Sequence, residues 1–208
     1  MNINDFAENL KNIIWNFSLT FEVKITDLTL ENLIKKALVK SNLNPDWNPG
    51  SHAPGADIFL PEQNIGFSVK SGRLNSKTLT ISSFRTTKYN TLQEKLDYFD
   101  GDGKNFSSYL VLARNDSDVS RYYRAIMIPA ELVEAASLQW EEMSTGWKSE
   151  KRGGVQMKIV KKMSDQFWFT IDRDVIDDHP DIKTLFELEI DNDMLGTYDF
   201  ELSENMTG

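Results

Sequence analysis

The stretch Gly55–Gly72 reads GADIFLPEQNIGFSVKSG and contains two short apolar runs on either side of a turn. Ala56–Leu60 is the first run, residues 61–64 are the turn, and Ile65–Lys70 is the second run. In the second run apolar residues alternate with small and polar ones, which is the period of a strand with two different faces. We therefore predict a β-hairpin whose second strand turns its apolar side chains, including Phe67, to a core.

This hairpin brings Asp57, near the start of its first strand, close to Lys70, near the end of its second, because paired strands lie about 5 Å apart. Ser68 and Lys70 would point together away from the core. One interpretation of the carboxylate and the ammonium is a cross-strand ion pair that contributes little to stability. The other is half of a metal-dependent phosphodiesterase site, in which the carboxylate holds a divalent cation and the lysine orients water or stabilises the transition state.

The residues Pro54–Asp57, followed after a spacer by Ser68–Lys70, resemble the motif of the PD-(D/E)xK superfamily of nucleases, and most closely the type II restriction endonucleases. The resemblance implies that Asp57 and Ser68 bind magnesium, for which manganese can substitute, and that Lys70 assists catalysis. Ser68 departs from the family pattern, which usually has Asp or Glu there. Many restriction enzymes supply a further acid from a helix before the motif, and this implies Glu31 as a fourth catalytic residue.

The resemblance also implies an α/β (α+β) fold, restriction-endonuclease-like, with a central mixed sheet flanked by helices. A chain of 208 residues is expected to form one domain, here residues 1–208 with an acidic C-terminal segment from residue 172. The implied activity is cleavage of double-stranded DNA at a short specific sequence, leaving 5′-phosphate. A homodimer is expected, because a two-fold symmetric DNA site is matched by a two-fold symmetric protein.

The composition restricts the chemistry that is possible. The chain has no cysteine and only two histidines, His52 and His179, so thiolate chemistry and a multi-histidine metal site are excluded. A bound metal would be held by oxygen atoms, which suits magnesium or manganese. The first residues show no signal-peptide pattern and no apolar run is long enough to cross a membrane, so we expect a cytoplasmic protein without a membrane partner.

The net charge of −9 is unevenly distributed along the chain. Residues 172–208 hold twelve acids and two bases, so residues 1–171 carry a net charge of +1. Two stretches, 63–93 and 148–163, are strongly basic, and phosphate contacts require local positive charge rather than a basic total. Each stretch alone could be a solvated face or a plain loop, but together they favour DNA binding. The candidate DNA-binding residues are Arg73, Lys77, Arg85, Lys88, Asn90, Lys151, Arg152, Gln156 and Lys158.

The remaining elements follow from periodicity and capping signals. We predict a helix from Asn4 to about Phe17, a helix capped by Thr29 and ending near Ser41 with Glu31 in its first turn, and a helix starting at the capping box of Thr91 and Glu94. A short helix is predicted at 131–137 and a polar segment at 140–154. Strands are predicted around residues 79–81 and at 109–113, 122–128, 155–159 and 166–171, with an edge strand at 185–190.

Two other functions remain open. A DNA-binding module that kept the fold without cleavage is motivated by Ser68, which lacks the carboxylate of the family motif. An acidic α/β protein that binds another protein through its tail is motivated by the charge of residues 172–208. Cleavage in the presence of magnesium separates the enzyme from the module, and DNA association at low salt separates both from the third function.

Overall fold

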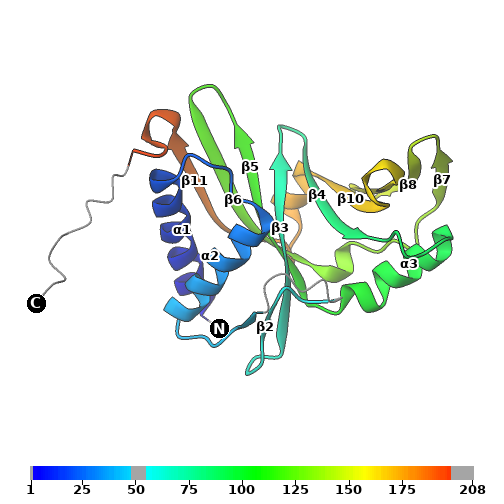
Figure 1. Ribbon diagram of the computed structural model, residues 1–208, viewed down its shortest axis with the longest axis horizontal. Helices are drawn as coiled ribbons and strands as arrows, with labels where there is room; N and C mark the ends of the chain where they lie inside the picture. Colours follow the sequence, from blue (N-terminus) through cyan, green and yellow to red (C-terminus); the bar gives the residue numbers. More distant parts are fainter. Residues whose placement is uncertain (1, 48–54, 198–208) are drawn as a thin grey trace, which may run out of the picture.

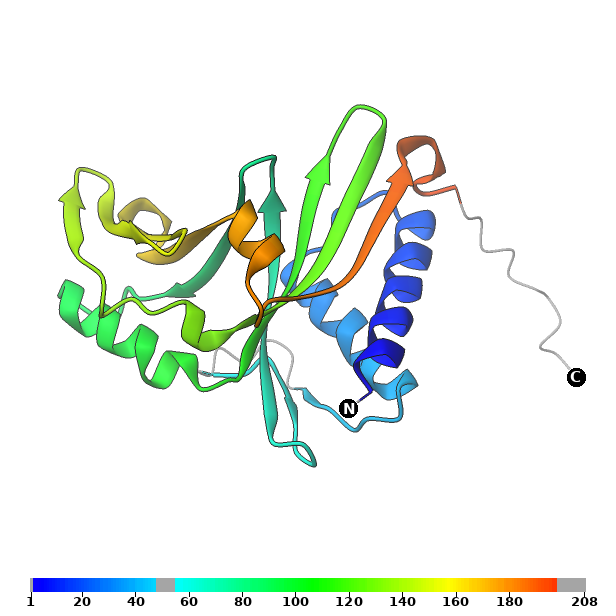
Figure 2. The same ribbon diagram turned by 180° about the vertical axis from the view of Figure 1, so that it is seen from behind.

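A large mixed β-sheet with helices on both of its faces forms the framework of the protein (Figure 1 and Figure 2). The computed structural model describes residues 2–47 and 55–197. The helices of this part are α1 (Ile3–Thr20), α2 (Asp27–Lys40), α3 (Leu92–Asp100) and α4 (Arg173–Asp178), with 3₁₀ turns η1 (Asp102–Lys104), η2 (Ala130–Leu132), η3 (Lys161–Met163) and η4 (Asn192–Met194). The strands are β1 (Asp46–Trp47), β2 (Ile58–Leu60), β3 (Ile65–Leu74), β4 (Thr78–Arg85), β5 (Ser108–Asp116), β6 (Ser120–Pro129), β7 (Trp140–Met143), β8 (Gly146–Arg152), β9 (Val155–Val160), β10 (Gln166–Asp172) and β11 (Lys183–Asp191). This arrangement confirms the predicted mixed sheet with flanking helices, while His52 and Pro54 lie outside the described residues.

Within the described residues, the main path of the sheet has the order β11-β6-β5-β3-β4-β10-β9-β8-β7, and β2 and β1 join it beside β3. β3 and β5 are parallel, and the other strand pairs are antiparallel. β11 pairs with β6 alone and is therefore the predicted edge strand. Glu187 and Glu189 are exposed on β11, while Leu188 and Ile190 are buried.

Alternation along the strands divides the apolar side chains between two cores, one on each face of the sheet. On one face, α1 and α2 pack against a core that includes Leu110 and Leu112 of β5. On the other face, α3 and α4 pack against a core that includes Tyr109 and Val111 of the same strand. β3 and β5 are thus covered on both faces, and the predicted core residue Phe67 is buried in the first core.

The start of α2 differs from the prediction. Thr26, not Thr29, caps the helix, because the Thr26 hydroxyl accepts a hydrogen bond from the Thr29 amide at 3.3 Å. The helix therefore begins at Asp27, and Glu31 lies in its second turn rather than its first. A favourable interaction with the helix dipole falls off within the first turn, so the dipole does not explain the presence of Glu31.

Three other predicted elements need correction. α1 is capped by Asn2 rather than Asn4 and extends past Phe17 to Thr20. The helix predicted at 131–137 is limited to the 3₁₀ turn η2, because the Asp100 carboxylate accepts hydrogen bonds from the amides of residues 135 and 136 and holds this segment outside a helix. The segment 140–154 contains strands β7 and β8, which form an antiparallel meander with β9 and β10. No helix in the described part of the chain has the length and apolar character needed to cross a membrane.

The predicted capping box at the start of α3 is present. The Thr91 hydroxyl accepts from the Glu94 amide at 3.3 Å, and the Glu94 carboxylate accepts from the Thr91 amide at 2.9 Å. We expect Thr91→Ala to lower the free energy of unfolding by about 1 kcal/mol, because it leaves an amide of the first turn without its partner. Urea unfolding of the variant measures this loss, with Thr87→Ala in the preceding loop as the control; equal stability of the two variants would contradict the prediction.

Lys95 on α3 is buried, with a side chain only 1% exposed. Its Nζ donates to the carbonyl oxygen of Thr86 at 2.9 Å, to the carbonyl oxygen of Tyr89, and to Asp165 Oδ2 at 3.0 Å. One ammonium group therefore joins α3, the loop after β4 and the turn before β10. Buried lysines are rare unless all of their donors are satisfied, and this one is satisfied by three oxygens.

Candidate active site at the open edge of β3

The predicted hairpin consists of β2 and β3, joined by the turn at residues 61–64. Ile58 lies opposite Phe67, and the Asp57 amide donates to the Phe67 carbonyl oxygen at 2.8 Å just before β2 begins. Asp57 is therefore held at the open end of the hairpin, next to the middle of β3. The hairpin places Asp57 and Lys70 in direct contact, as the alternation of the sequence predicted.

β3 has an interval in its edge where no strand pairs with it. β5 occupies one edge of β3 from Phe67 to Arg73. The other edge is shared by β2, which pairs with residues 65–67, and β4, which pairs with residues 72–74. In the described part of the chain, residues 68–71 therefore have no strand partner on this edge, and their backbone groups there depend on side chains or water.

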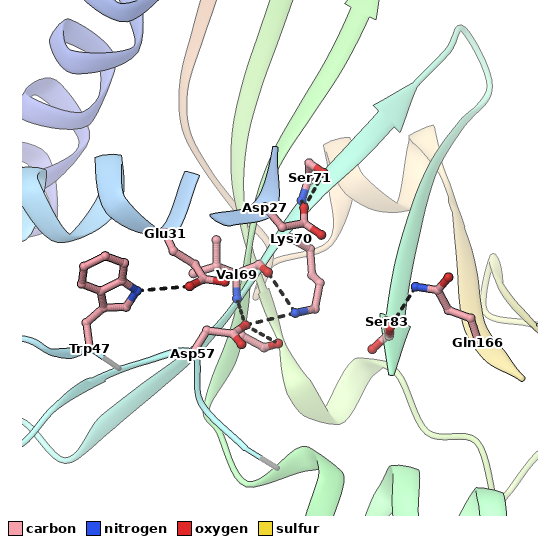
Figure 3. A network of polar contacts seen from close by, with 10 residues as sticks. Asp27, Glu31, Trp47, Asp57, Val69, Lys70, Ser71, Ser83 and Gln166 are labelled. Carbon is pink, nitrogen blue, oxygen red and sulfur yellow. Dashed lines mark hydrogen bonds and ion pairs between the residues drawn. The ribbon is translucent and has the colours of Figure 1, made fainter. Parts of the chain in front are cut away.

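Asp57 accepts one of these backbone hydrogen bonds and two more from the side chains of Ser68 and Lys70 (Figure 3). Its Oδ2 atom accepts from the Val69 amide at 2.6 Å, from the Ser68 hydroxyl at 3.1 Å and from Lys70 Nζ at 3.0 Å. Lys70 Nζ also donates to the Val69 carbonyl oxygen at 2.9 Å. The side chains of Lys70 and Asp57 are 13% and 28% exposed, so the ion pair is accessible from solvent.

Two acids of α2 reach the same edge of β3 (Figure 3). Asp27 Oδ1 accepts from the Ser71 amide at 2.7 Å and from the Ser71 hydroxyl. Glu31 Oε2 accepts from the Trp47 indole N–H at 3.1 Å. Because α2 begins at Asp27, both acids lie within the helix. They are four residues apart, which is about one helical turn, so both lie on the side of α2 that faces β3.

The pKa of Glu31 is raised above its ordinary value. Burial is the largest cause, and the negative charges of Asp57 and Asp27 add to it, while the hydrogen bond from Trp47 and the charge of Lys70 oppose it. The raised pKa shows that the charged form of Glu31 is disfavoured in the folded protein. A nearby cation would relieve this penalty, because it would favour the charged carboxylate.

We expect Glu31→Gln to stabilise the protein at neutral pH. Because the folded-state pKa is raised, the contribution of Glu31 to stability is fully present below the unfolded-state pKa and is lost as the pH rises through the folded-state pKa. Glutamine keeps the acceptor for Trp47 and removes the charge, so the gain should be absent in acid and should develop above the unfolded-state pKa. Urea unfolding of both proteins between pH 4 and pH 8 tests this, and a gain that does not change with pH would contradict it.

The oxygen atoms around Asp57 and Glu31 fit a hard divalent cation. Asp57 Oδ1 and Glu31 Oε1 accept no hydrogen bond from the described residues, so each carboxylate keeps one oxygen available. No group of three or more His, Asp or Glu side chains in the described ranges is arranged to hold a metal ion. Glu62 lies in the turn at the far end of the hairpin from Asp57, so Glu31 is the better placed second acid. A cation here would need water or phosphate oxygens to complete its coordination.

The candidate DNA-binding residues are not gathered in one place. Arg73 lies on β3, three residues from Lys70, and is exposed. Lys151 forms an ion pair with Asp172 at 2.5 Å, and Arg152 forms one with Glu150 at 2.5 Å. The remaining candidates occupy the β3–β4 turn, the end of β4 with the loop before α3, and β9: Lys77, Arg85, Lys88, Asn90, Gln156 and Lys158.

Sequence reasoning missed Asp27 and Trp47, which complete the surroundings of Glu31. Asp27 directly follows Thr26, and this pair is a typical helix-start signal that the choice of Thr29 as the cap obscured. Trp47 gave no local signal, because its contact with Glu31 depends on the short pairing of β1 with β2. Comparisons of the chain with protein-family models, with curated proteins and with solved structures find no match.

Proposed function

We propose that this protein is a magnesium-dependent endonuclease that hydrolyses phosphodiester bonds in double-stranded DNA, as a type II restriction endonuclease does, leaving 5′-phosphate. The proposal includes a restriction-endonuclease-like fold over the single domain 1–208. The observation that carries it is the accessible pair of Asp57 and Lys70 at the open edge of β3, with Glu31 beside it. This arrangement combines an oxygen-rich position for a cation with a fixed positive charge.

Asp57 and Glu31 would hold the metal through the oxygens that accept no hydrogen bond from the described residues. Magnesium bound there would lower the pKa of a water molecule and offset the negative charge of the phosphate, and manganese could substitute. The raised pKa of Glu31 makes its participation dependent on pH, because a carboxylic acid must lose its proton to act as a metal ligand.

Lys70 would act on the attacking water or on the phosphate. An ammonium group has three N–H donors, and two of them are directed at Asp57 and at the Val69 carbonyl oxygen. The third donor remains for a water molecule or a phosphoryl oxygen. Because the hydrogen bonds to Asp57 and Val69 fix the position of Nζ before substrate binds, its charge is preorganised for the negative charge that develops in the transition state.

Ser68 is fully buried, and its hydroxyl donates to Asp57 at 3.1 Å. In our proposal Ser68 is a positioning residue, and the metal is held by Asp57 and Glu31. We expect Ser68→Ala to reduce cleavage by about tenfold or less, since it removes one hydrogen bond worth about 1 kcal/mol. The magnesium concentration for half-maximal cleavage should rise together with this loss. Initial cleavage rates measured across a magnesium titration test this, and a loss as large as that of an Asp57 variant would show that the hydroxyl itself contacts the metal or the substrate.

A digest of a sequenced plasmid tests the proposed function directly. The protein is incubated with the plasmid and magnesium, with manganese, and with a chelator. Discrete fragments with 5′-phosphate ends in the first two reactions and intact DNA in the third are expected. A short symmetric target implies a homodimer, which light scattering of the purified protein measures. The proposed substrate also implies action in the cytoplasm.

A non-cleaving DNA-binding module is the second candidate function. The observation that favours it is the buried Ser68 at the position where the family motif has a carboxylate; among the described residues no group of three or more acids is arranged to hold a metal. Binding of DNA that stays intact at high protein and magnesium concentrations would identify the module. If DNA does not associate at low salt, both DNA-directed functions are wrong, and the acidic segment from residue 172 becomes the place to search for a protein partner.

A further inference from the structure

A groove of about 1040 Å³ lies directly beside the candidate site, on the face of the sheet that carries α1 and α2. Its walls come from the start of α2 with the segment just before it, and from β3, β4, β5, β6 and β10. Asp27 and Ser71 line the groove and also belong to the open edge of β3 described above. The groove and the candidate site therefore share a boundary, one residue along β3 from Lys70.

The groove is positively charged, although the whole chain carries −9. Lys24 and Arg73 line it, are exposed, and have no ion-pair partner among the residues that the structure describes. Asp116 at the groove is bound by both Arg114, at 3.2 Å, and Arg121, at 3.3 Å, so this cluster adds positive charge. Asp27 is the other acid in the lining, and Ser71 occupies its Oδ1. A ligand with negative charge is favoured at this place.

Two buried polar atoms at the groove have no hydrogen-bond partner within the described chain. They are the hydroxyl oxygen of Tyr123, a residue that is 1% exposed, and the indole nitrogen of Trp168. A buried donor without a partner costs about 1–3 kcal/mol, so an acceptor that reached these side chains would recover this energy. Phosphate oxygens and base edges are such acceptors.

We propose that this groove holds the DNA strand that continues from the scissile phosphate, so that Arg73 and Lys24 bind its backbone and Trp168 contacts its bases. This inference rests on the proposed function. Lys70 and Arg73 are three residues apart on β3, about 10 Å along the strand, and their side chains leave β3 on opposite faces, so the DNA strand would pass over the open edge at residues 68–71 to reach both. With the DNA axis along β3, one strand of the duplex rises about 10 Å over about three phosphates, so Arg73 would meet a phosphate two to four positions from the one that is cut. Thr80 and Ser82 of β4 also line the groove, in the strand between Arg73 of β3 and Trp168 of β10, and they contribute hydroxyl groups for further contacts.

The test uses the full chain and a duplex that contains the sequence cut in the plasmid digest, with binding measured in a chelator so that the DNA stays intact. Arg73→Gln and Lys24→Gln remove one charge each, and Lys36→Gln, on an exposed position of α2 outside the groove, is the matched control. Each groove variant should reduce the slope of log affinity against log salt by about one, and the control should leave it unchanged. Replacing single phosphates by neutral methylphosphonates should weaken binding of the wild type two to four positions from the cut, and Arg73→Gln should lose this sensitivity at one position.

The outcomes separate the inference from the function on which it rests. If the wild type binds and cuts DNA but the groove variants behave like Lys36→Gln, the groove is not the path of the strand, and the proposed function stands. If methylphosphonates weaken binding of the wild type and of Arg73→Gln equally at all positions, Arg73 does not contact the backbone and the inference is also overturned. If the wild type does not bind DNA at low salt, both fail together.

Discussion

Asp57→Asn is expected to abolish cleavage while leaving the protein folded. The Asn oxygen can still accept from the Val69 amide and the Ser68 hydroxyl, so the hairpin keeps these hydrogen bonds. The variant loses the negative charge that would hold a cation and pair with Lys70. Removal of one preorganised electrostatic group costs about 10²–10³-fold in rate, and the loss of a metal ligand is expected to reach or exceed this range.

Two quantities are measured for purified Asp57→Asn: the rate of plasmid cleavage in saturating magnesium, and the urea concentration at the midpoint of unfolding. The partly exposed ion pair contributes about 0–1 kcal/mol, so the midpoint should change little. Glu62→Gln, an isosteric change in the turn of the same hairpin, is the control and should cut normally. Lys70→Ala should be as inactive as Asp57→Asn. Retained cleavage by purified Asp57→Asn would rule out the assigned site, and loss in the Glu62 control would show that the hairpin itself is sensitive.

Lys95→Met is expected to destabilise the protein by about 3–5 kcal/mol without touching the candidate site. Methionine preserves much of the volume, but it leaves Asp165 and the carbonyl oxygens of Thr86 and Tyr89 without their shared donor. Such a loss is a large fraction of the stability of a typical domain. The loop after β4 would remain attached to the turn before β10 through the amide and hydroxyl of Thr86, which both donate to the Asp165 carbonyl oxygen.

Urea unfolding measures this effect, and Lys88→Met, an exposed lysine in the neighbouring loop, is the control. The double variant Lys95→Met with Asp165→Asn should recover part of the loss, because it removes the uncompensated charge but leaves the two carbonyl oxygens unpaired. A loss below about 1 kcal/mol in Lys95→Met, or no recovery in the double variant, would contradict the role assigned to the buried ion pair.

The local parts of the structure were predictable because local patterns encode them. The alternation in Ile65–Lys70 and the turn before it specify a hairpin, and the hairpin alone places Asp57 beside Lys70. The capping box at Thr91 and the apolar runs at 109–113 and 122–128 were equally informative. Strands β7 and β8 were missed because WEEM and WKSEKR are largely polar and lack a clear alternation of apolar residues.

The surroundings of the hairpin could not be predicted, since they depend on contacts between distant segments. The open edge of β3 exists because β2 and β4 pair with the same side of the strand while β5, about forty residues later, occupies the other. Glu31 entered only through the resemblance to nucleases, and the role of Asp27 follows from a helix start that was misplaced by three residues. The groove beside the site combines five strands and the start of a helix, and within the predicted DNA-binding set Arg73 lines it.

Within the described residues, β11 and β7 end the main path of the sheet and limit how two copies of the chain can associate. β11 presents Glu187 and Glu189 along one margin, and β7 presents Glu141 and Glu142 along the other. Glu187 pairs with Arg124 and Glu142 pairs with Lys161 of the same chain, but edge strands rich in charged side chains still oppose a continuous intermolecular sheet. A two-fold dimer is therefore expected to join through helices or loops, and its two hairpins would then approach a DNA duplex as independent arms rather than as parts of one extended β-surface.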